Sequence, residues 1–489
     1  MRKYFVIVIL LVASSLGSAA QPRKITFKTE GLTDSTLYIA QHFRDSYIVV
    51  DSATANGNQY TFSGSKLERG IYALLAQNRT KQFTDFVVDG SQKFTIACNQ
   101  QFDASAMKVS GCKANSQMFA YIAKQMEARN RATEINERRR SADPEVKQKA
   151  EKDYAALSAE MENYEKQTLK TNANQYFFRL ITMFAEPDVP DTIDNKLYYY
   201  LNHYWDNVDM TDHSLTLTPN LYNKMNYYFF GVLYNADFDT IKKYADTILT
   251  RVQHDSVMLR YFLDHIMPRY YRSTKNIGWD AEWCHLVRRY YLAGLCPWAT
   301  PGDLTSKQRQ AEYLEKSLIG AYGAELVMAD TTQSDDPANW ISSHRFPERY
   351  VILWFWDPDC HHCQEQTATL KTLYDSLQKA PDRRFEVYAV GYESDVEKWK
   401  RYVRNHHLPF VNVGGTHVNI DYQEAYNVHG APTMIILNAD RQIIMNKVLP
   451  TKSILPFLND YEKRHPEQAN RPLSRWQQLG LRIKQQENN

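Results

Sequence analysis

The stretch that decides the fold is YVILWFWDPDCHHC, which spans residues 350–363. Its first seven residues are all apolar, a pattern typical of a β-strand buried on both faces. Cys360 and Cys363 follow where this strand meets a predicted helix over residues 361–378. The stretch therefore places two thiols, separated by two residues, at the start of a helix in an α/β layer.

That position suits thiol–disulfide exchange. A thiolate, not a thiol, attacks a disulfide. The unpaired N–H groups and partial positive charge at a helix N-terminus stabilise a thiolate, so Cys360 is the predicted nucleophile. Cys363 lies one turn further on and is the predicted resolving thiol. His362 is expected to tune the thiolate through positive charge or a hydrogen bond.

Other kinds of site also use paired cysteines. A c-type haem site needs a histidine directly after the second cysteine, where this chain has Gln364. A structural zinc site needs four ligands, and the chain has no second Cys-x-x-Cys. The pattern favours redox chemistry, with zinc or copper handling and an inert disulfide as alternatives. The histidines that would have to complete a metal site are His361, His362, His406, His407, His417 and His429.

The chain beyond the cysteines alternates between strand and helix patterns, which predicts an α/β layer fold. The apolar runs predict strands, and the segments between them have helical periodicity. The tail, residues 466–489, is polar and is expected to be a loosely packed helix or disordered. The predicted elements are strands at 385–390, 433–437 and 442–446 and helices at 396–406 and 453–463.

Two motifs in this region resemble known ones. The segment 351–363 resembles the active-site segment of thioredoxins, and most closely that of the TlpA-like branch of the bacterial envelope. Further along, Gly430-Ala431-Pro432-Thr433 resembles the family's cis-proline loop, and residues 438–441 resemble the turn of its last hairpin without the usual glycine. The resemblance covers residues 325–465 and predicts a thioredoxin-like domain at 321–465.

The resemblance implies roles for several residues. The peptide bond before Pro432 would be cis, and Pro432 would face the cysteine pair and shape the substrate groove. Ala431 and Thr433 would offer backbone groups to a substrate strand, and Trp356 is assigned to the same substrate-binding surface.

The sequence also departs from the family. Thioredoxin has a buried aspartate six residues before the first cysteine, where this chain has Trp354. The glutamate often found three residues after the second cysteine in the TlpA-like branch is Gln366 here. Glu365 is therefore only a candidate proton shuttle. His362 stands where disulfide isomerases carry histidine, which favours a more oxidising couple than that of thioredoxin.

The chain before residue 321 suggests two accessory domains. Residues 21–114 contain short alternating strands with Asn-Gly and Asp-Gly turns, which predict an all-β sandwich. This part resembles, loosely, a small β-domain found ahead of envelope thioredoxin modules. Residues 115–320 are predicted to be all-α. They begin with an antiparallel hairpin of two charged helices, 116–140 and 145–171, and continue with helices rich in tyrosine. The tyrosine clusters fit helix packing better than a glycan- or peptide-binding surface.

The N-terminus has the pattern of a secretory signal peptide over residues 1–20. A charged Met-Arg-Lys start is followed by an apolar run, and small residues end the segment at Ala20. An uncleaved anchor is the alternative. The apolar run is shorter than the ~20 residues that a membrane span needs. We therefore expect export to the periplasm or elsewhere in the cell envelope.

Four further cysteines form two pairs close in sequence. Cys98 with Cys112, and Cys284 with Cys296, are tentative structural disulfides of an exported protein. The alternative is four buried free thiols, because cysteine also packs as a small apolar residue.

The sequence as a whole predicts a periplasmic thiol–disulfide oxidoreductase that acts on protein thiols and disulfides. A partner thiol protein would supply or accept electrons, with no cofactor and no metal. The formal net charge of +2 gives no basic excess for nucleic acid. No membrane span is expected after signal removal. The alternative function is an envelope binding or scaffold protein whose thioredoxin domain docks partners without turnover.

Overall fold

The computed structural model describes residues 23–271, 279–378, 384–392, 395–469 and 472–487. It divides into two compact units, Met1–Asn235 with Thr247–Phe262, and Ala236–Asp246 with Leu263–Asn489. The predicted signal peptide, residues 1–20, lies outside the described residues. Within those residues no helix is both long and apolar enough to cross a membrane.

The first unit begins with an eight-stranded sheet of order β6-β5-β2-β3-β4-β1-β7-β8. Neighbouring strands are antiparallel except for β1 and β7, which are parallel. The alternation of buried and exposed side chains along β1 and β4 fits strands with one face in the core. The strands are β1 (Arg23–Thr29), β2 (Thr36–Phe43), β3 (Ser46–Asn56), β4 (Gln59–Gly64), β5 (Gly70–Leu75), β6 (Gln82–Val88), β7 (Lys93–Cys98) and β8 (Lys108–Ser110).

This sheet bends over so that its two halves share one aromatic core. The ring of Phe27 on β1 lies 5.4 Å from that of Phe86 on β6, although four strands separate β1 from β6 in the sheet. Phe94 on β7 also packs on Phe86, at 6.3 Å. The predicted all-β sandwich is confirmed, because side chains from strands far apart in the sheet face each other.

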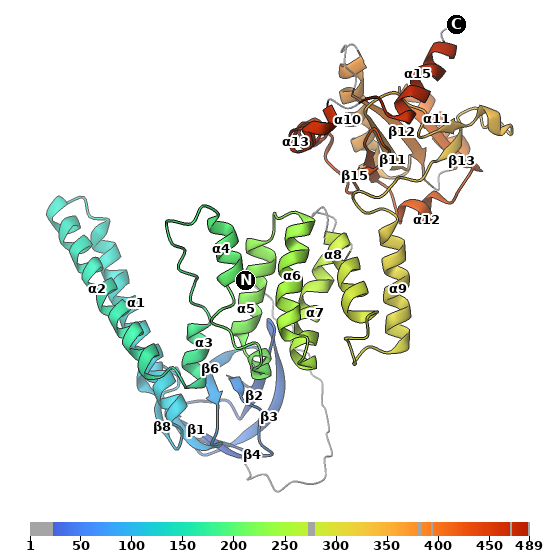
Figure 1. Cartoon of the computed structure of the whole chain (residues 1–489). Helices are drawn as coiled ribbons and strands as arrows, with labels where there is room; N and C mark the ends of the chain where they lie inside the picture. The colour runs from blue at the N-terminus through green and yellow to red at the C-terminus, as the bar shows by residue number, and fades with distance from the viewer. Residues whose placement is uncertain (1–22, 272–278, 379–383, 393–394, 470–471, 488–489) are drawn as a thin grey trace. The chain divides into compact units, whose positions relative to one another are not determined.

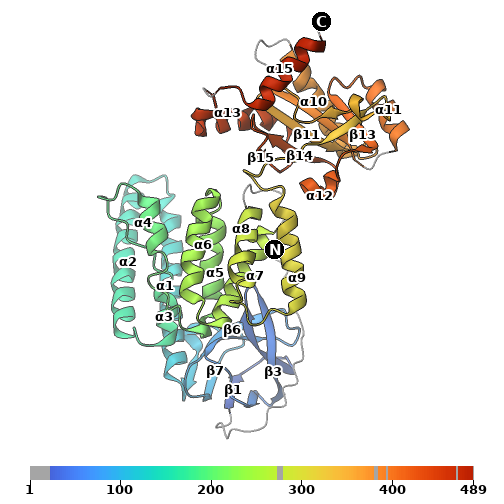
Figure 2. The same ribbon diagram turned by 45° about the vertical axis from the view of Figure 1, so that its right-hand side comes forward.

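The predicted helical hairpin is confirmed as α1 (Lys113–Arg139) and α2 (Pro144–Thr171), which lie side by side in both views (Figures 1 and 2). Asp143 caps α2 by accepting a hydrogen bond from the Glu145 N–H at 2.9 Å, and Pro144 occupies the first turn. A narrow apolar seam joins the two helices, formed by Ala128, Ile135, Ala150 and Leu157.

Shorter aromatic helices follow. Tyr228 and Tyr290 are fully buried, and the Tyr228 hydroxyl donates to the Leu201 carbonyl, so these two tyrosines are used in packing. Both lie in π-helical turns, Tyr228–Val232 and Val287–Tyr291. The α-helices are α3 (Tyr176–Thr182), α4 (Lys196–His203), α5 (Pro219–Tyr227), α6 (Phe238–Val252), α7 (Ser256–Tyr270), α8 (Trp279–Leu286) and α9 (Pro301–Glu315).

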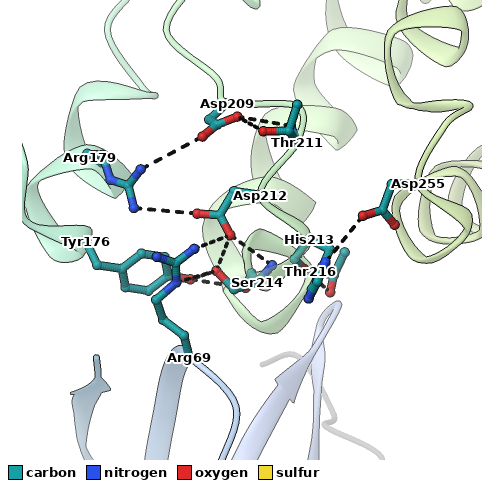
Figure 3. Close-up of polar contacts among 10 residues, drawn as sticks. All are labelled: Arg69, Tyr176, Arg179, Asp209, Thr211, Asp212, His213, Ser214, Thr216 and Asp255. Atoms are coloured by element: carbon teal, nitrogen blue, oxygen red, sulfur yellow. Dashed lines mark hydrogen bonds and ion pairs between the residues drawn. The ribbon is translucent and has the colours of Figure 1, made fainter. Parts of the chain in front are cut away.

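A polar cluster ties the β-sheet to the first short helices within the first unit (Figure 3). Arg69, next to β5, pairs with the buried Asp212 at 2.7 Å, and Ser214 donates to the same carboxylate at 2.6 Å. Arg179 on α3 approaches Asp212 more loosely, at 3.6 Å. The Arg69 guanidinium also lies over the Tyr176 ring. The charges are mutually compensated, as expected for a structural junction.

The second unit ends in an α/β layer built on a seven-stranded sheet of order β10-β9-β13-β12-β11-β14-β15. The fully buried strand β11 lies between parallel β12 and antiparallel β14. The strands are β9 (Val327–Asp330), β10 (Ile341–Ser342), β11 (Tyr350–Trp356), β12 (Phe385–Gly391), β13 (Val411–Val418), β14 (Thr433–Leu437) and β15 (Ile443–Met445). The helices are α10 (His361–Gln378), α11 (Val396–Asn405), α12 (Tyr422–Tyr426), α13 (Ile454–Arg464), α14 (Pro466–Ala469) and α15 (Arg475–Glu487).

The tail is better packed than the sequence suggests. In α15, Gly480 has no Cβ, and one built there would lie 2.4–2.6 Å from backbone atoms of residues 345–347. Lys484 pairs with the buried Glu348 at 2.7 Å. The tail was expected to be loose because its composition is polar, but the glycine allows a close backbone approach that composition does not reveal.

Candidate redox site

Strand β11 and helix α10 position the cysteine pair. β11 is held by neighbours on both sides, so its C-terminal end is rigid. The chain then turns through residues 357–360, where the Cys360 N–H donates to the Asp357 carbonyl at 3.2 Å. The Gln364 side chain donates to the Pro358 carbonyl at 2.7 Å and braces this turn. Helix α10 therefore begins directly after Cys360.

The two cysteines differ in exposure. Cys360 is half-buried, whereas Cys363 has no exposed surface. Both are free thiols, and the Cys363 N–H donates to Cys360 Sγ at 3.2 Å. This hydrogen bond is the helix N-terminal interaction that favours a thiolate on Cys360.

Burial, and to a smaller extent the neighbouring Cys360 thiol, raise the pKa of the Cys363 thiol to about 12. Cys363 is therefore protonated at neutral pH.

The loop before β14 meets Cys360 from the other side. The Ala431–Pro432 peptide bond is cis, as the sequence resemblance implied. The Cys360 thiol lies 3.9 Å from the Ala431 carbonyl oxygen, within sulfur hydrogen-bonding range. The Thr433 hydroxyl donates to the Gly430 carbonyl at 2.7 Å and closes the loop. Ala431, Pro432 and Thr433 are all partly exposed, and the Ala431 contact places their loop beside Cys360.

The two histidines and Glu365 form an exposed group. The Glu365 carboxylate lies 3.3 Å from His361 Nε2 and 3.8 Å from His362 Nδ1. No hydrogen bond joins either imidazole, or Glu365, to a cysteine sulfur among the described residues. The tuning role of His362 therefore stays a prediction, and so does the proton-shuttle role of the exposed Glu365.

The comparison with known proteins decides the family of this layer. Residues 348–443 match a family model described as thioredoxin-like. The C-terminal layer is a thioredoxin-like domain. Residues 24–118 and 156–293 match two models, each described as a domain of unknown function (DUF4369 and DUF5106). No curated protein matches the chain.

Solved structures of bacterial proteins are similar to parts of this chain. A thioredoxin-like protein from Bacteroides caccae shares 17% identity, with 57% of this chain and 98% of that chain covered and a TM-score of 0.45. A domain of a possible thiol-disulfide isomerase from Cytophaga hutchinsonii shares 28% identity, covering 31% and 97%, with a TM-score of 0.27. The thioredoxin domain of a thiol-disulfide oxidoreductase from Bacteroides vulgatus shares 19%, covering 29% and 96%, with a TM-score of 0.25.

Two tryptophans of the thioredoxin-like domain are fully buried, and one of them, Trp354, stands where thioredoxin has an aspartate. The Trp354 indole N–H donates to the Thr367 hydroxyl at 3.0 Å in a fully buried, uncharged pair, so this position supplies no proton carrier. Trp356 is also fully buried and packs on the Tyr402 ring at 5.2 Å. Its side chain has no exposed surface here, which leaves Ala431 and Thr433 as the accessible members of the predicted substrate surface.

No sequence pattern indicates Lys398 on α11, whose ammonium forms an ion pair with the exposed Asp359. This pair offsets one of the two acidic charges that precede Cys360. The pair joins α11 to the turn before α10, and no local pattern in the sequence predicts so distant a partner.

The other four cysteines lie outside this site. Neither Cys98 with Cys112 nor Cys284 with Cys296 is bonded in the structure, so both pairings stay predictions. Burial raises the pKa of Cys98 to about 11 and that of Cys284 and Cys296 to about 12. Among the described residues, no cluster of three or more His, Cys, Asp or Glu side chains could hold a metal ion.

Proposed function

We propose that this chain is an exported thiol–disulfide oxidoreductase of the TlpA-like type that exchanges disulfides with protein substrates through Cys360 and Cys363. The observation that carries the proposal is the 3.2 Å hydrogen bond from the Cys363 N–H to the Cys360 sulfur at the start of α10. It supports an accessible nucleophile beside a shielded partner thiol, the division of labour that exchange requires.

The exchange would proceed in two steps. The Cys360 thiolate attacks a substrate disulfide, forms a mixed disulfide and releases one substrate thiolate. Cys363 then loses its proton and attacks the Cys360 sulfur, which releases the second substrate thiolate and leaves a Cys360–Cys363 disulfide. Two electrons pass to the substrate, and a partner dithiol protein restores the pair; the reverse sequence oxidises a substrate.

Because burial raises the pKa of the Cys363 thiol, the second step depends on a group that accepts its proton. With Trp354 and Thr367 in place of an acid, we propose that water or the departing substrate thiolate takes this proton. Pro432 would shape the groove, and Ala431 and Thr433 would bind the substrate backbone. The N-terminal segment, residues 1–20, would direct export, followed by domains at 21–114, 115–320 and 321–465 and a tail at 466–489.

Trapping tests this function. In the Cys363→Ser variant the mixed disulfide cannot be resolved, so partner proteins should accumulate as covalent adducts that a reductant releases. The Cys360→Ser variant is the matched control and should form none. If neither variant traps a protein and the wild type does not reduce insulin, the chain is not an exchange enzyme, and the scaffold alternative replaces it.

A further inference from the structure

Helices α8 and α9 form a wall beside the loop that carries Pro432. A cavity of about 300 Å³ is lined on one side by Pro432 and Thr433, and on the other by Asp280 from α8 and Leu314 from α9. All of these residues belong to the second unit. In both views α9 runs up to α12 of the thioredoxin-like domain (Figures 1 and 2).

Buried polar contacts hold this wall in place. Lys447, two residues after β15, pairs with Asp280 at 3.0 Å, and both side chains are largely buried, at 13% and 4% exposed. The Asn446 amide donates to Asp280 and to the Ser317 carbonyl, both at 2.9 Å. Breaking such a buried, hydrogen-bonded pair leaves an uncompensated charge, so the wall is a fixed part of the domain's surroundings.

A larger cleft of about 980 Å³ lies along the same wall. One side is the face of α9 that presents Arg309 and Tyr313, and the other side includes Glu424 and His429. His429 lines this cleft and also the smaller cavity beside Pro432. The cleft therefore leads along α9 to the loop whose Ala431 carbonyl lies 3.9 Å from the Cys360 sulfur.

The cleft carries side chains of both signs, and the cation that α9 contributes to it is the Arg309 guanidinium. It is exposed, stacks on the Tyr313 ring at 5.8 Å, and has no carboxylate partner among the described residues. Opposite it, Glu424 is already paired with Lys316 at 2.7 Å. Asp421 accepts the backbone N–H groups of the first turn of α12. A guanidinium in this setting is suited to binding a carboxylate through two N–H groups.

We propose that α9 is a specificity-determining wall of the redox site, and that the cleft takes an extended, cysteine-bearing segment of a protein substrate with acidic residues near the cysteine. The inference rests on the proposed exchange function. The volume of the cleft falls within the roughly 300–1,000 Å³ typical of ligand sites, which is large enough for several residues of peptide. A cysteine-bearing segment is favoured because the cleft is continuous with the cavity beside Pro432. Acidic residues are favoured because the Arg309 guanidinium has no carboxylate partner among the described residues.

The test uses the full-length reduced protein and short peptides that carry a central cysteine as a mixed disulfide with nitrothiobenzoate. Attack by Cys360 bonds the peptide to the protein and releases the coloured nitrothiobenzoate thiolate. The cysteine is flanked by glutamates in one peptide and by lysines in the other. We expect the wild type to react faster with the acidic peptide, and Arg309→Glu to reduce the acidic-to-basic rate ratio about fivefold, the size expected for an exposed charge pair.

Lys307→Glu is the matched control. It makes the same charge change on α9, but Lys307 lies on the Tyr291 ring outside the cleft, so the rate ratio should stay at the wild-type value. A wild type without an acidic preference, or an equal shift in both variants, would overturn the proposal. Oxidised β-mercaptoethanol, a neutral disulfide, tests the wild type separately: if it too fails to react, the proposed exchange function itself is wrong.

Discussion

At the scale of single residues, the two thiols lie close together in the sequence but differ in how far they are buried. Cys360 and Cys363 occupy adjacent turns, yet only Cys360 reaches the surface. The motif could be predicted from the sequence because its four residues are contiguous. The uncharged Trp354–Thr367 pair could not be predicted, because no sequence pattern indicates that these two side chains are in contact.

The first prediction concerns alkylation. With iodoacetamide at about pH 6, the reduced protein should be labelled at Cys360 first, because the thiolate is the reacting species. Cys363 should remain unlabelled, since burial raises its pKa to about 12 and shields it from the reagent. Peptide mass mapping measures both sites, and Cys360→Ser is the control that should take up no label at residue 363. Preferential labelling of Cys363 would reverse the assigned roles.

The second prediction uses His362 and Glu365, two exposed side chains that lie near each other. His362→Pro should lower the reduction potential, because it removes a group that favours the thiolate and hence the reduced form. Glu365→Gln should raise it, because a nearby negative charge is lost. Each shift should be about 10–30 mV, since 30 mV corresponds to about 1.4 kcal/mol and both side chains are exposed to screening water.

A glutathione titration of the three proteins measures these shifts. We expect a wild-type value of roughly −250 to −180 mV, more oxidising than thioredoxin near about −270 mV. A wild-type value below the thioredoxin level, or shifts of the same sign in both variants, would show that these charges do not tune the couple.

At the scale of elements, strong local patterns were predictable and weak ones were not. The expected strand 350–356 and helix 361–378 match β11 and α10, because an apolar run and a helix-start motif adjoin there. Strand β13 (Val411–Val418) was missed. Its sequence contains Gly414 and Gly415, which are more typical of a turn than of a strand interior. In the structure its register against β9 is irregular. Its identity as a strand comes from its neighbours in the sheet.

The last hairpin shows how a departure from the family is accommodated. Arg441 stands at a left-handed position, φ 64°, where glycine is usual. Its fully buried guanidinium donates to the carbonyls of Asn438, His344 and Phe346. The side chain thereby joins the β14–β15 turn to the segment that precedes β11.

The third prediction follows from these contacts. Arg441→Gly should relieve about 1 kcal/mol of backbone strain. It also leaves the buried carbonyls of His344 and Phe346 without the Arg441 donor, at about 1–3 kcal/mol each, so the net effect should be destabilisation by about 1–5 kcal/mol. Urea unfolding measures the difference. His407→Gly is the control: His407 is also left-handed, at φ 47°, but its side chain is exposed, so the change should be neutral or slightly stabilising. A stabilised Arg441→Gly would show that strain outweighs the hydrogen bonds.

At the scale of the whole molecule, what could be predicted divides along the chain. The three-part order of β-sandwich, helices and thioredoxin-like fold was predictable, because each part has its own periodicity. The wall formed by α9 was not. Arg309 and Tyr313 belong to a largely polar helix, and only tertiary packing, which includes the Asp280–Lys447 pair, brings them into one cleft with His429. A motif search finds the reacting atoms, whereas the surface that selects substrates comes from elements without a motif.

The last prediction concerns the four remaining cysteines. In protein isolated from an oxidising compartment we expect Cys98 to be joined to Cys112 and Cys284 to Cys296, with Cys360 bonded only to Cys363. Each local link would close a loop of about 15 residues or fewer, worth up to ~3 kcal/mol in the chain-entropy model. Mass mapping of non-reduced peptides decides this. Recovery of all four as free thiols would favour the unbonded arrangement seen here, in which the Cys98 thiol donates to the Lys28 carbonyl and Cys284 to that of Ala311. A peptide linking Cys98 or Cys284 to Cys360 would contradict the exchange mechanism itself, because the nucleophile would then be consumed by a structural bond.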